Sequence, residues 1–584
     1  MPSRVWNYFS RSIDKSKATC DLCKKVFEYK GTTSNLLNHL NSQHPTSNKD
    51  DTPSKQGSVA SFLCTPKKSK VENEKITQAI ADMIVSDMVP LSMVEGKGFQ
   101  NLMDIVAPGY VVPTRKTIKT RVQRRYDAEK EALTSELSNV TSASITTDTW
   151  TSNRTESFIT VTEQHINDDW ELKSHVLITR AMPERHTGAN LAQRLKDCVS
   201  EFKLSDKVEA CVHDNARNIQ SAGNMCKDWG DLGCFAHTLQ LSMKPAFLVP
   251  EVCDLVSKCR KLVGHFKHST TLTAEFTDRQ KSMDNVPKRS LVQDVATRWN
   301  STYDMMSRLL EQRRVVSDIM LDPKLTKKAD CELYLENADW NLLSELCSIL
   351  APFKSTTEYM CTEKNVSVSE IYPIVSGLVS KRLVECTDDS ATAAEVKRLI
   401  RDDLMSRYGP TGDVAPTSLP ALGALLDPRH KKLTFFTSAQ RKKTHAILES
   451  RLDDLPLLLP VNPPENCEQT PKRARKLDFI DYGSPDRSEI EDELQMYLVE
   501  KSVPDCDPLV WWKENEGRFP KISHVAKSVL SVPATSVPSE RVFSCAGTLL
   551  NKLRNSLSSD FVDTVIFLNK NKVEFKTRSM SLVN

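Results

Sequence analysis

The stretch Ser144-Ile145-Thr146-Thr147-Asp148-Thr149-Trp150 begins the part of the chain whose pattern decides the fold. β-Branched and aromatic residues dominate it, and similar runs follow at residues 158–162 and 172–178, which predicts three strands. Residues 191–202 show helical spacing, residues 207–213 predict a fourth strand, and Asp214-Asn215-Ala216 opens another helix. The predicted order is therefore β-β-β-α-β-α.

Two aspartates stand at the ends of predicted strands, Asp148 on the first strand and Asp214 after the fourth. This strand order is what a ribonuclease H-like core requires, and in such a core the first and fourth strands are neighbours. The two carboxylates would then meet at one edge of the sheet and hold Mg²⁺ or Mn²⁺ for phosphoryl chemistry. The alternative is that both aspartates are turn formers or helix caps, a common role for aspartate at the end of a strand.

The remainder of the chain has helical periodicity, interrupted by two polar stretches. Residues 71–140 predict a helical region, and residues 245–456 predict a large all-helical insertion after the first part of the core, residues 141–244. Residues 46–70 and 457–487 are rich in Ser, Thr, Pro and charged residues, which predicts disordered linkers. Residues 488–575 form the last folded segment, so the prediction is a multidomain α+β protein.

A candidate zinc site precedes all of this, in residues 1–45. Cys20, Cys23, His39 and His44 stand in the order Cys-x2-Cys-x15-His-x4-His. Two thiolates and two imidazoles at these spacings can close a tetrahedral zinc site. A segment this short buries too little apolar surface to fold alone, so zinc binding would supply its folding free energy. The alternative is a chance grouping in a chain with 16 Cys and 12 His.

An aromatic cluster that includes Trp6 and Phe9 precedes the first cysteine, and Leu36, Leu37 and Leu40 bracket His39 at helical spacing to form a small predicted core. In these surroundings the segment resembles the BED zinc finger, a ββα-type finger, and the resemblance implies that it binds DNA. Residues 1–70 hold twelve Lys or Arg against five Asp or Glu, a net charge of +7. Such a local excess of positive charge is typical of protein segments that bind the phosphate groups of nucleic acids. Double-stranded DNA is therefore the predicted ligand.

A second basic cluster lies between residues 115 and 125 and contains no acidic residue. Several of its members are three or four residues apart, so one helical face could follow a phosphate backbone. The alternative is an ordinary solvated helix face. The predicted DNA-binding residues here are Arg115, Lys116, Lys119, Arg121, Arg124 and Arg125.

Bulk composition is that of folded, water-soluble domains, with 39% hydrophobic and 27% charged residues in 584 and a net charge of only +3. No apolar run approaches the roughly 18 residues needed to cross a bilayer, and no apolar leader precedes the finger, so we expect an intracellular protein that does not bind membranes. Basic runs at residues 66–70 and 472–476 match nuclear import signals, which predicts a nuclear location.

The C-terminal segment carries the most specific motif, Pro533-Ala534-Thr535-Ser536-Val537-Pro538-Ser539-Glu540-Arg541-Val542-Phe543-Ser544. With the finger, Thr147-Asp148-Thr149-Trp150-Thr151, His213-Asp214-Asn215-Ala216, Cys234-Phe235-Ala236-His237 and Arg298-Trp299, it makes nearly the whole chain resemble hAT-superfamily transposases and their domesticated BED-finger relatives. The resemblance implies that residues 488–575 are the hAT dimerisation region and complete the ribonuclease H-like core. We therefore expect self-association, as a homodimer or a higher oligomer.

The same resemblance assigns roles to particular residues. Asp148, Asp214 and Glu540 would be the acidic triad, with Glu540 in the first turn of a helix, as Thr535, Ser536 and Pro538 also indicate. Trp299, with Arg298 beside it, would lie near the DNA, although a tryptophan packed inside the insertion is the alternative. Cys234 and His237 would be a structural pair that shapes the helix beside the active site.

Two functions fit these patterns. The first is a nuclear zinc-dependent DNA-binding protein of hAT descent that regulates transcription and no longer cuts DNA. The second is an active hAT-type transposase that uses the acidic triad and two Mg²⁺ ions to cleave and join strands. No departure from the family pattern occurs at the three triad positions. Strand cleavage is therefore possible on the sequence alone.

The zinc-ligand spacing generates a direct test. Chelation of zinc, or the substitution His39→Ala, should unfold the finger and abolish sequence-specific DNA binding, because the metal supplies the folding free energy of this segment. The measurement is a mobility-shift titration at matched salt, since phosphate contacts elsewhere depend on ionic strength. Specific binding by the His39→Ala protein at wild-type affinity would contradict the prediction.

Overall fold

The structure is a computed structural model that describes residues 4–29, 31–44, 69–152, 155–362, 365–409, 414–455, 488–549 and 558–571. The chain divides into two compact units, one that contains the N-terminal finger and one that contains the sheet and most of the helices. Both predicted linkers fall largely outside the described residues, as do the basic runs at 472–476 and, apart from its last two residues, at 66–70. None of the described helices is long and apolar enough to cross a membrane.

The finger is a three-stranded antiparallel sheet followed by a helix. Its elements are η1 (Arg4–Asn7), β1 (Phe9–Arg11), β2 (Lys17–Cys20), β3 (Val26–Glu28) and α1 (Ser34–Gln43). Val5, Phe9, Leu36 and Leu40 form its small core, as the aromatic and leucine pattern predicts. Leu37 does not join them, because its side chain lies on the outer face of α1 and is 42% exposed.

Helices precede and flank the sheet of the larger unit. Those between the finger and the sheet are α2 (Lys70–Ser86), η4 (Leu91–Glu95), α3 (Lys97–Val106) and α4 (Arg115–Leu137). Ile80, Ile84 and Val85 are buried on α2, in agreement with their spacing. Thr114 caps α4 by accepting a hydrogen bond from the amide of Thr117, which satisfies one of the free N–H groups of the first turn.

The β-β-β-α-β-α order is confirmed, with one further strand. The elements are β4 (Ala143–Thr151), β5 (Ser157–Ile166), β6 (Leu172–Ala181), α5 (Gly188–Glu201), β7 (Val208–His213), α6 (Arg217–Gly223) and β8 (Gly230–Gly233). The sheet order is β6-β5-β4-β7-β8, so the first and fourth strands are neighbours. β8 is absent from the sequence prediction because its residues, Gly-Asp-Leu-Gly, have low strand propensity and are ordered by pairing with β7.

A helical insertion follows the sheet, as predicted, and no strand interrupts it within the described residues. Its elements are α7 (Phe235–Phe247), α8 (Pro250–His268), α9 (Thr270–Ser282), α10 (Trp299–Glu311), α11 (Arg313–Met320), η5 (Lys328–Leu333), α12 (Asn337–Met360), η6 (Val368–Glu370), α13 (Ile371–Gly377), a π-helical turn η7 (Leu378–Arg382), α14 (Ala391–Tyr408), η8 (Ala415–Thr417), α15 (Leu419–Leu426) and α16 (Ser438–Asp453).

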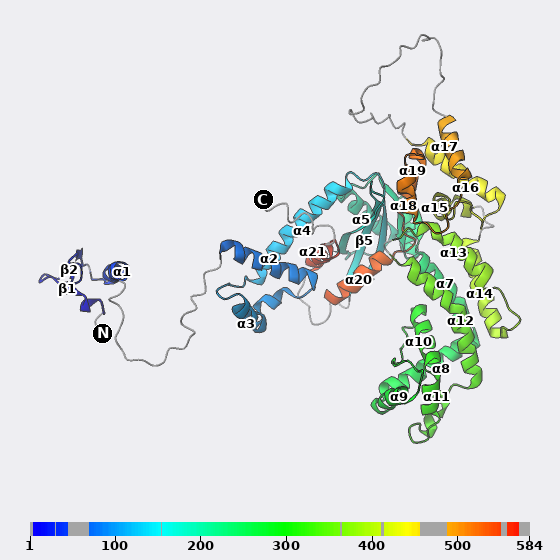
Figure 1. Ribbon diagram of the computed structural model, residues 1–584, viewed down its shortest axis with the longest axis horizontal. Coiled ribbons are helices and arrows are strands. Elements are labelled where there is room, and N and C mark those ends of the chain that lie inside the picture. The colour runs from blue at the N-terminus through cyan, green and yellow to red at the C-terminus, as the bar shows by residue number, and fades with distance from the viewer. Residues whose placement is uncertain are drawn as a thin grey trace, which may run out of the picture. The chain divides into compact units, whose positions relative to one another are not determined.

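The C-terminal segment returns to the sheet and packs helices against it. Its helices are α17 (Ser488–Val499), α18 (Pro508–Asn515), α19 (Pro520–Leu530), α20 (Val537–Leu549) and α21 (Ser559–Lys570). Figure 1 shows α20 and α21 beside the strands of the sheet, although more than 300 residues separate them from β6 in the sequence. The multidomain α+β fold is therefore confirmed.

Helix α21 covers the edge of the sheet formed by β6. Asn571 at its C-terminal end accepts a hydrogen bond from the amide of Val176 and donates one to the carbonyl of Val176, both at 2.9 Å. Asp563 on the same helix accepts a hydrogen bond from the amide of Thr179 at 2.6 Å. These side chains take the place of a neighbouring strand for the backbone groups of Val176 and for the amide of Thr179.

This edge cap leads to a stability prediction. Asn571→Ala should lower the free energy of unfolding by about 2 kcal/mol, because it leaves two buried backbone groups of Val176 without partners. Thermal and urea unfolding measure the change. Gln193→Ala, which removes an exposed hydrogen bond to Asp197 on α5, is the control and should cost less than about 0.5 kcal/mol. Equal effects of the two substitutions would contradict a role for Asn571 in the edge.

Candidate functional site

The four predicted zinc ligands meet at one point in the finger. The ligand atoms of Cys20, Cys23, His39 and His44 all lie within 4.8 Å of one another. The cysteines belong to a tight knuckle that Lys24 closes directly after Cys23: its backbone is left-handed (φ 63°) and its amide donates a hydrogen bond to the carbonyl of Cys20. Both histidines come from α1 and its C-cap, so one turn of helix brings the two rings to a centroid distance of 5.2 Å.

This donor set fits zinc. Cys23 Sγ lies 3.2 Å from His39 Nε2, and His44 Nε2 is a buried nitrogen with no hydrogen-bond partner among the described residues. Burial, followed by the nearby His44 and Lys25, lowers the pKa of His39, which favours the neutral imidazole that a metal ligand must be. Zn²⁺ bound by the two sulfurs and two nitrogens would occupy the space between these atoms.

The second candidate site is built from two neighbouring parallel strands. In the β4–β7 ladder Thr146 is paired with Val212, and Asp148 and Asp214 each follow two residues later. Because parallel strands run in register, the two aspartates emerge side by side at the same end of the sheet. Asp214 lies just past the end of β7 and accepts a hydrogen bond from the amide of Ala216.

Helix α20 adds the third carboxylate. Ser539 Oγ hydrogen-bonds to Thr146 Oγ1 at 2.5 Å, and the ring of Phe543 lies 5.7 Å from that of Trp150. Thr146 and Trp150 are on the same face of β4 as Asp148, since side chains alternate along a strand. The two contacts therefore place Glu540, in the first turn of α20, beside Asp148.

The pKa of Asp148 reflects the proximity of the other two carboxylates. Burial of the side chain, followed by the negative charge of Asp214, raises the pKa of Asp148 from 3.8 to about 8, and the charge of Glu540 adds to the increase. A hydrogen bond from the amide of Thr149, at 2.7 Å, opposes it. Among the described residues, the oxygen atoms of the three carboxylates are not all within 4.8 Å of one another, unlike the ligand atoms of the finger.

A strained turn carries Asp214, and sequence reasoning missed its supports. Asn215 has a left-handed backbone (φ 54°) and donates its side-chain amide to Thr238 Oγ1 at 2.9 Å. A Cβ atom on Gly233 would lie 1.8 Å from Asn215 Oδ1, so only glycine fits at the end of β8. His213 Nε2 lies 2.8 Å from Asp231 Oδ1 while its Nδ1 accepts the Asn215 amide, so Nε2 is the protonated nitrogen. Strain of this kind concentrates at functional sites.

Cys234 and His237 occupy the start of α7 behind this turn. Cys234 is fully buried, its amide donates to the carbonyl of His213 at 2.7 Å, and burial raises the pKa of its thiol. The next amide, of Phe235, donates to the carbonyl of Ala534 and so joins α7 to the C-terminal segment. His237 is half-buried, and among the described residues neither side chain gathers a metal-ligating group with Cys211 or His213. Cys234 and His237 therefore lie where they can pack the start of α7 against the turn at Asp214, as the predicted structural pair would.

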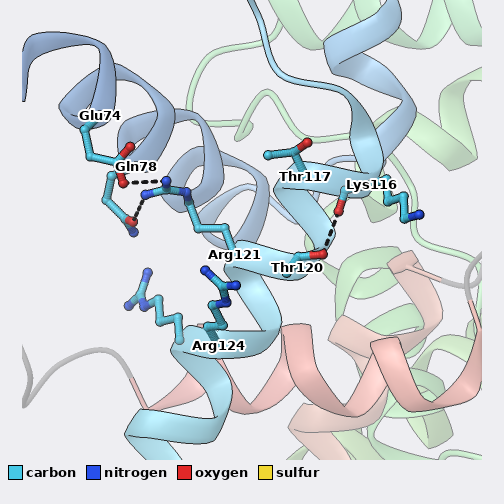
Figure 2. Close-up of a pocket in the computed structure, with 8 residues that line it drawn as sticks. Glu74, Gln78, Lys116, Thr117, Thr120, Arg121 and Arg124 are labelled. Carbon is cyan, nitrogen blue, oxygen red and sulfur yellow. Dashed lines mark hydrogen bonds and ion pairs between the residues drawn. The ribbon is translucent and has the colours of Figure 1, made fainter. Parts of the chain in front are cut away.

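The predicted basic cluster lies on α4, and Lys116, Arg121, Arg124 and Arg125 line an open cavity of about 600 Å³, shown in Figure 2. Two of its arginines turn inward to α2: Arg121 contacts Glu74 at 2.5 Å and Gln78 at 3.3 Å, and Arg125 contacts Asp82 at 2.5 Å. Arg115 pairs with Glu95 at 3.5 Å, and the Lys119 ammonium lies 5.4 Å from the ring of Phe561. Lys116 and Arg124 are the exposed cations at the cavity. Fewer basic side chains of α4 therefore face solvent without an acidic or aromatic partner than the six that the sequence predicts for DNA binding.

Arg298 and Trp299 lie at the start of α10, in the helical insertion. Arg298 is the N-cap residue and is exposed, whereas Trp299 is only 6% exposed and belongs to the core of the insertion. The indole lines a cavity of about 440 Å³ with Lys244, Arg260 and Thr297. Trp299 is therefore packed inside the insertion, which was the alternative to a position near the DNA. A role for Trp299 near the DNA stays a prediction.

Four family models match separate parts of the chain. Residues 3–45 match the BED zinc finger, residues 146–229 the ZBED1 RNase-like domain, residues 232–349 the ZBED1 RNase-like helical domain, and residues 493–572 the hAT family C-terminal dimerisation region. The four matches follow the order of the finger, the sheet, the insertion and the C-terminal helices.

Several curated proteins are similar over most of the chain. Human zinc finger BED domain-containing protein 4 is 24% identical over 97% of this chain and 52% of its own length. The putative transcriptional regulator tpeD of Talaromyces stipitatus is 23% identical over 89% of this chain and 64% of its own. The putative AC transposase of Zea mays is 23% identical over 97% of this chain and 75% of its own. The chain thus spans only half to two thirds of the length of the first two relatives.

The raised pKa of Asp148 generates a test that needs no activity assay. Because its pKa is about 8 in the folded chain and near 3.8 when unfolded, the folded state holds the extra proton, and stability should fall as pH rises from 4 to 8. Asp148→Asn removes this penalty, so without metal it should melt on the order of 5 °C above wild type at pH 8 and equally at pH 4.

Divalent metal and a surface substitution serve as controls for this experiment. Mn²⁺ at pH 8 should raise the melting temperature of wild type more than that of Asp148→Asn, since the ion neutralises the clustered carboxylates. Asp206→Asn, at an exposed position, should change neither result. Identical pH dependence of Asp148→Asn and wild type would show that Asp148 does not carry the extra proton.

Proposed function

Since this chain is a hAT-derived protein with a BED zinc finger, we propose that it is a nuclear DNA-binding regulator of transcription that acts as a dimer or a higher oligomer. The observation that carries the proposal is the closed Cys2His2 group of the finger, whose ligand atoms lie within 4.8 Å of one another in a domain that the BED model matches. BED fingers bind DNA, so the chain is a DNA-binding protein of hAT descent.

Charge around the finger and on α4 supports a phosphate partner. The finger segment carries a net charge of +7 over residues 1–70, and Lys116 and Arg124 add exposed cations on α4. In this proposal the finger reads sequence and the α4 cations add affinity that does not depend on sequence. The name of the relative tpeD, a putative transcriptional regulator, supports a regulatory output for such binding.

Self-association is supported by the match to the hAT dimerisation region. Trp511 and Trp512 of α18 are buried within this chain, at 9% and 0% exposure. Larger apolar exposure occurs beside them, at Met496 (55%), Val499 (81%) and Val510 (54%). We assign the contact with a second copy to this surface of α17 and α18, because exposed aliphatic groups gain most from burial.

The alternative function is an active transposase, and the convergence of Asp148, Asp214 and Glu540 favours it. Three carboxylates offer the oxygen ligands that Mg²⁺ or Mn²⁺ prefers. Bound there, the ions would activate the attacking oxygen and stabilise the leaving oxygen of a phosphodiester displacement. The chain's own part is to aim three carboxylates from β4, β7 and α20 at one point. The relative named putative AC transposase is consistent with this alternative.

Selection of bound sequences from random double-stranded DNA tests the regulator proposal. Wild-type protein should enrich one motif, and a reporter gene that carries this motif should change its expression when the protein is present. A protein with Cys20→Ser and Cys23→Ser should enrich none, because its finger lacks two zinc ligands. No enriched motif for the zinc-loaded wild type would refute the proposal.

A cleavage assay separates the two functions. In Mg²⁺ or Mn²⁺ we expect wild-type protein not to nick or cut supercoiled DNA or hairpin-ended DNA. Asp148→Asn, Asp214→Asn and Glu540→Gln should bind DNA within about twofold of wild type, because the finger and the α4 cations are unchanged. Cleavage by wild type that each substitution abolishes would instead establish the transposase. Cleavage that survives all three substitutions would show that the triad is assigned to the wrong residues.

A further inference from the structure

A second group of metal-ligating side chains lies in the sheet, away from the finger and the acidic triad. Glu163 and His165 are two residues apart on β5, so both lie on the same face of the sheet. His175 on β6 is the direct cross-strand partner of Glu163. Glu163 is paired with Ile145 on β4, whereas Asp148 is paired with Thr160, so the group occupies the face opposite Asp148.

The three side chains converge on one another in the interior. His165 Nδ1 lies 2.6 Å from Glu163 Oε1, and His175 Nδ1 lies 3.0 Å from Glu163 Oε2. The exposed fractions are 0% for Glu163, 2% for His165 and 5% for His175. The two imidazole rings are nearly parallel, at an interplanar angle of 26° and a centroid distance of 5.9 Å. The group is one of two sets in the described residues whose ligand atoms all lie within 4.8 Å of one another, and the other set is the finger.

The carboxylate of Glu163 has to be neutralised inside the protein. Burial of an unpaired carboxylate costs several kcal/mol, and the ion pairs formed by Glu163 in the described structure are both with histidines. The nearest basic residue in the ladder is Lys173, opposite His165, and its ammonium pairs with Glu171 at 3.1 Å. The negative charge is therefore left to a protonated imidazole or to a bound cation.

The donor atoms select the cation. Two imidazole nitrogens and two carboxylate oxygens form a mixed N/O set, and each nitrogen faces its own oxygen. Zn²⁺ binds imidazole nitrogen at about 2.0–2.1 Å and carboxylate oxygen at similar distances, in tetrahedral geometry. Two imidazole nitrogens and the Glu163 carboxylate would fill three of the four positions, and one water molecule would complete the tetrahedron. Mg²⁺ and Ca²⁺ favour sites built from oxygen atoms alone.

We propose that Glu163, His165 and His175 bind a structural Zn²⁺ ion that ties β6 to β5. The ion would hold the edge strand of the sheet from the face opposite the acidic triad, while α21 holds its free edge from outside. Since it uses none of the residues assigned to DNA binding or cleavage, the site is independent of the proposed function. It predicts two zinc ions per chain, one in the finger and one in the sheet.

Metal analysis of the purified full-length chain tests this proposal. Mass-spectrometric counting should find two zinc ions per wild-type chain and one in the chain with Cys20→Ser and Cys23→Ser. Adding Glu163→Gln to that chain should reduce the count to nearly zero, whereas adding His445→Gln, a histidine on α16 outside the group, should leave one. One zinc in wild type and none in the finger variant would overturn the proposal, and this result does not depend on how the Glu163→Gln chain folds.

Cobalt substitution gives a second readout on the same finger variant, in which Glu163, His165 and His175 are intact. Loaded with Co²⁺, it should show the visible d–d absorption of a tetrahedral ion without a thiolate charge-transfer band, since the ligands are nitrogen and oxygen. A spectrum with no tetrahedral band would overturn the assigned geometry. One equivalent of a metal other than zinc, present in the finger variant as isolated, would overturn the choice of zinc.

Discussion

The parallel hydrogen bonding between β4 and β7 is the constraint on which the larger unit depends. It places residues 148 and 214, which are far apart in the sequence, at the same end of two adjacent strands. The antiparallel β5 and β6 then extend the sheet on one side and the short β8 on the other. Every other part of the candidate site is positioned against this pair of strands: the turn at Asn215 follows β7, and α20 crosses the face of β4.

The packing that brings Glu540 to the aspartates uses no charge. A hydroxyl pair, Thr146 with Ser539, and an aromatic contact, Trp150 with Phe543, hold α20 on β4. The three carboxylates repel one another, and the structure accommodates this by raising the pKa of Asp148. The fold therefore carries the electrostatic cost of a metal site whether or not an ion is bound.

In the proposed function, DNA recognition is divided between the finger, which needs a metal, and α4, which needs none. The finger has a core of only a few side chains, among them Phe9, Leu36 and Leu40, and depends on the ligand cluster beside it. Helix α4 is held to α2 by the ion pairs of Arg121 and Arg125. These arginines thus contribute to the fold. Lys116 and Arg124 are the exposed cations at the cavity that could contact a phosphate group.

The sequence alone determined the strand order, the all-helical insertion and the zinc ligands, because periodicity and ligand spacing are local properties of the chain. The three acids rest on the resemblance to hAT transposases, and their role stays a prediction. Tertiary structure decided the rest. β8 forms only because β7 offers a partner, the basic cluster loses two arginines to acids on α2, and Trp512 joins the interior rather than an exposed surface. The Glu163, His165 and His175 group had a partial signal, since Glu-x-His in a strand puts two ligands on one face. Its third member depends on the register between β5 and β6, which cross-strand packing sets and local sequence does not specify.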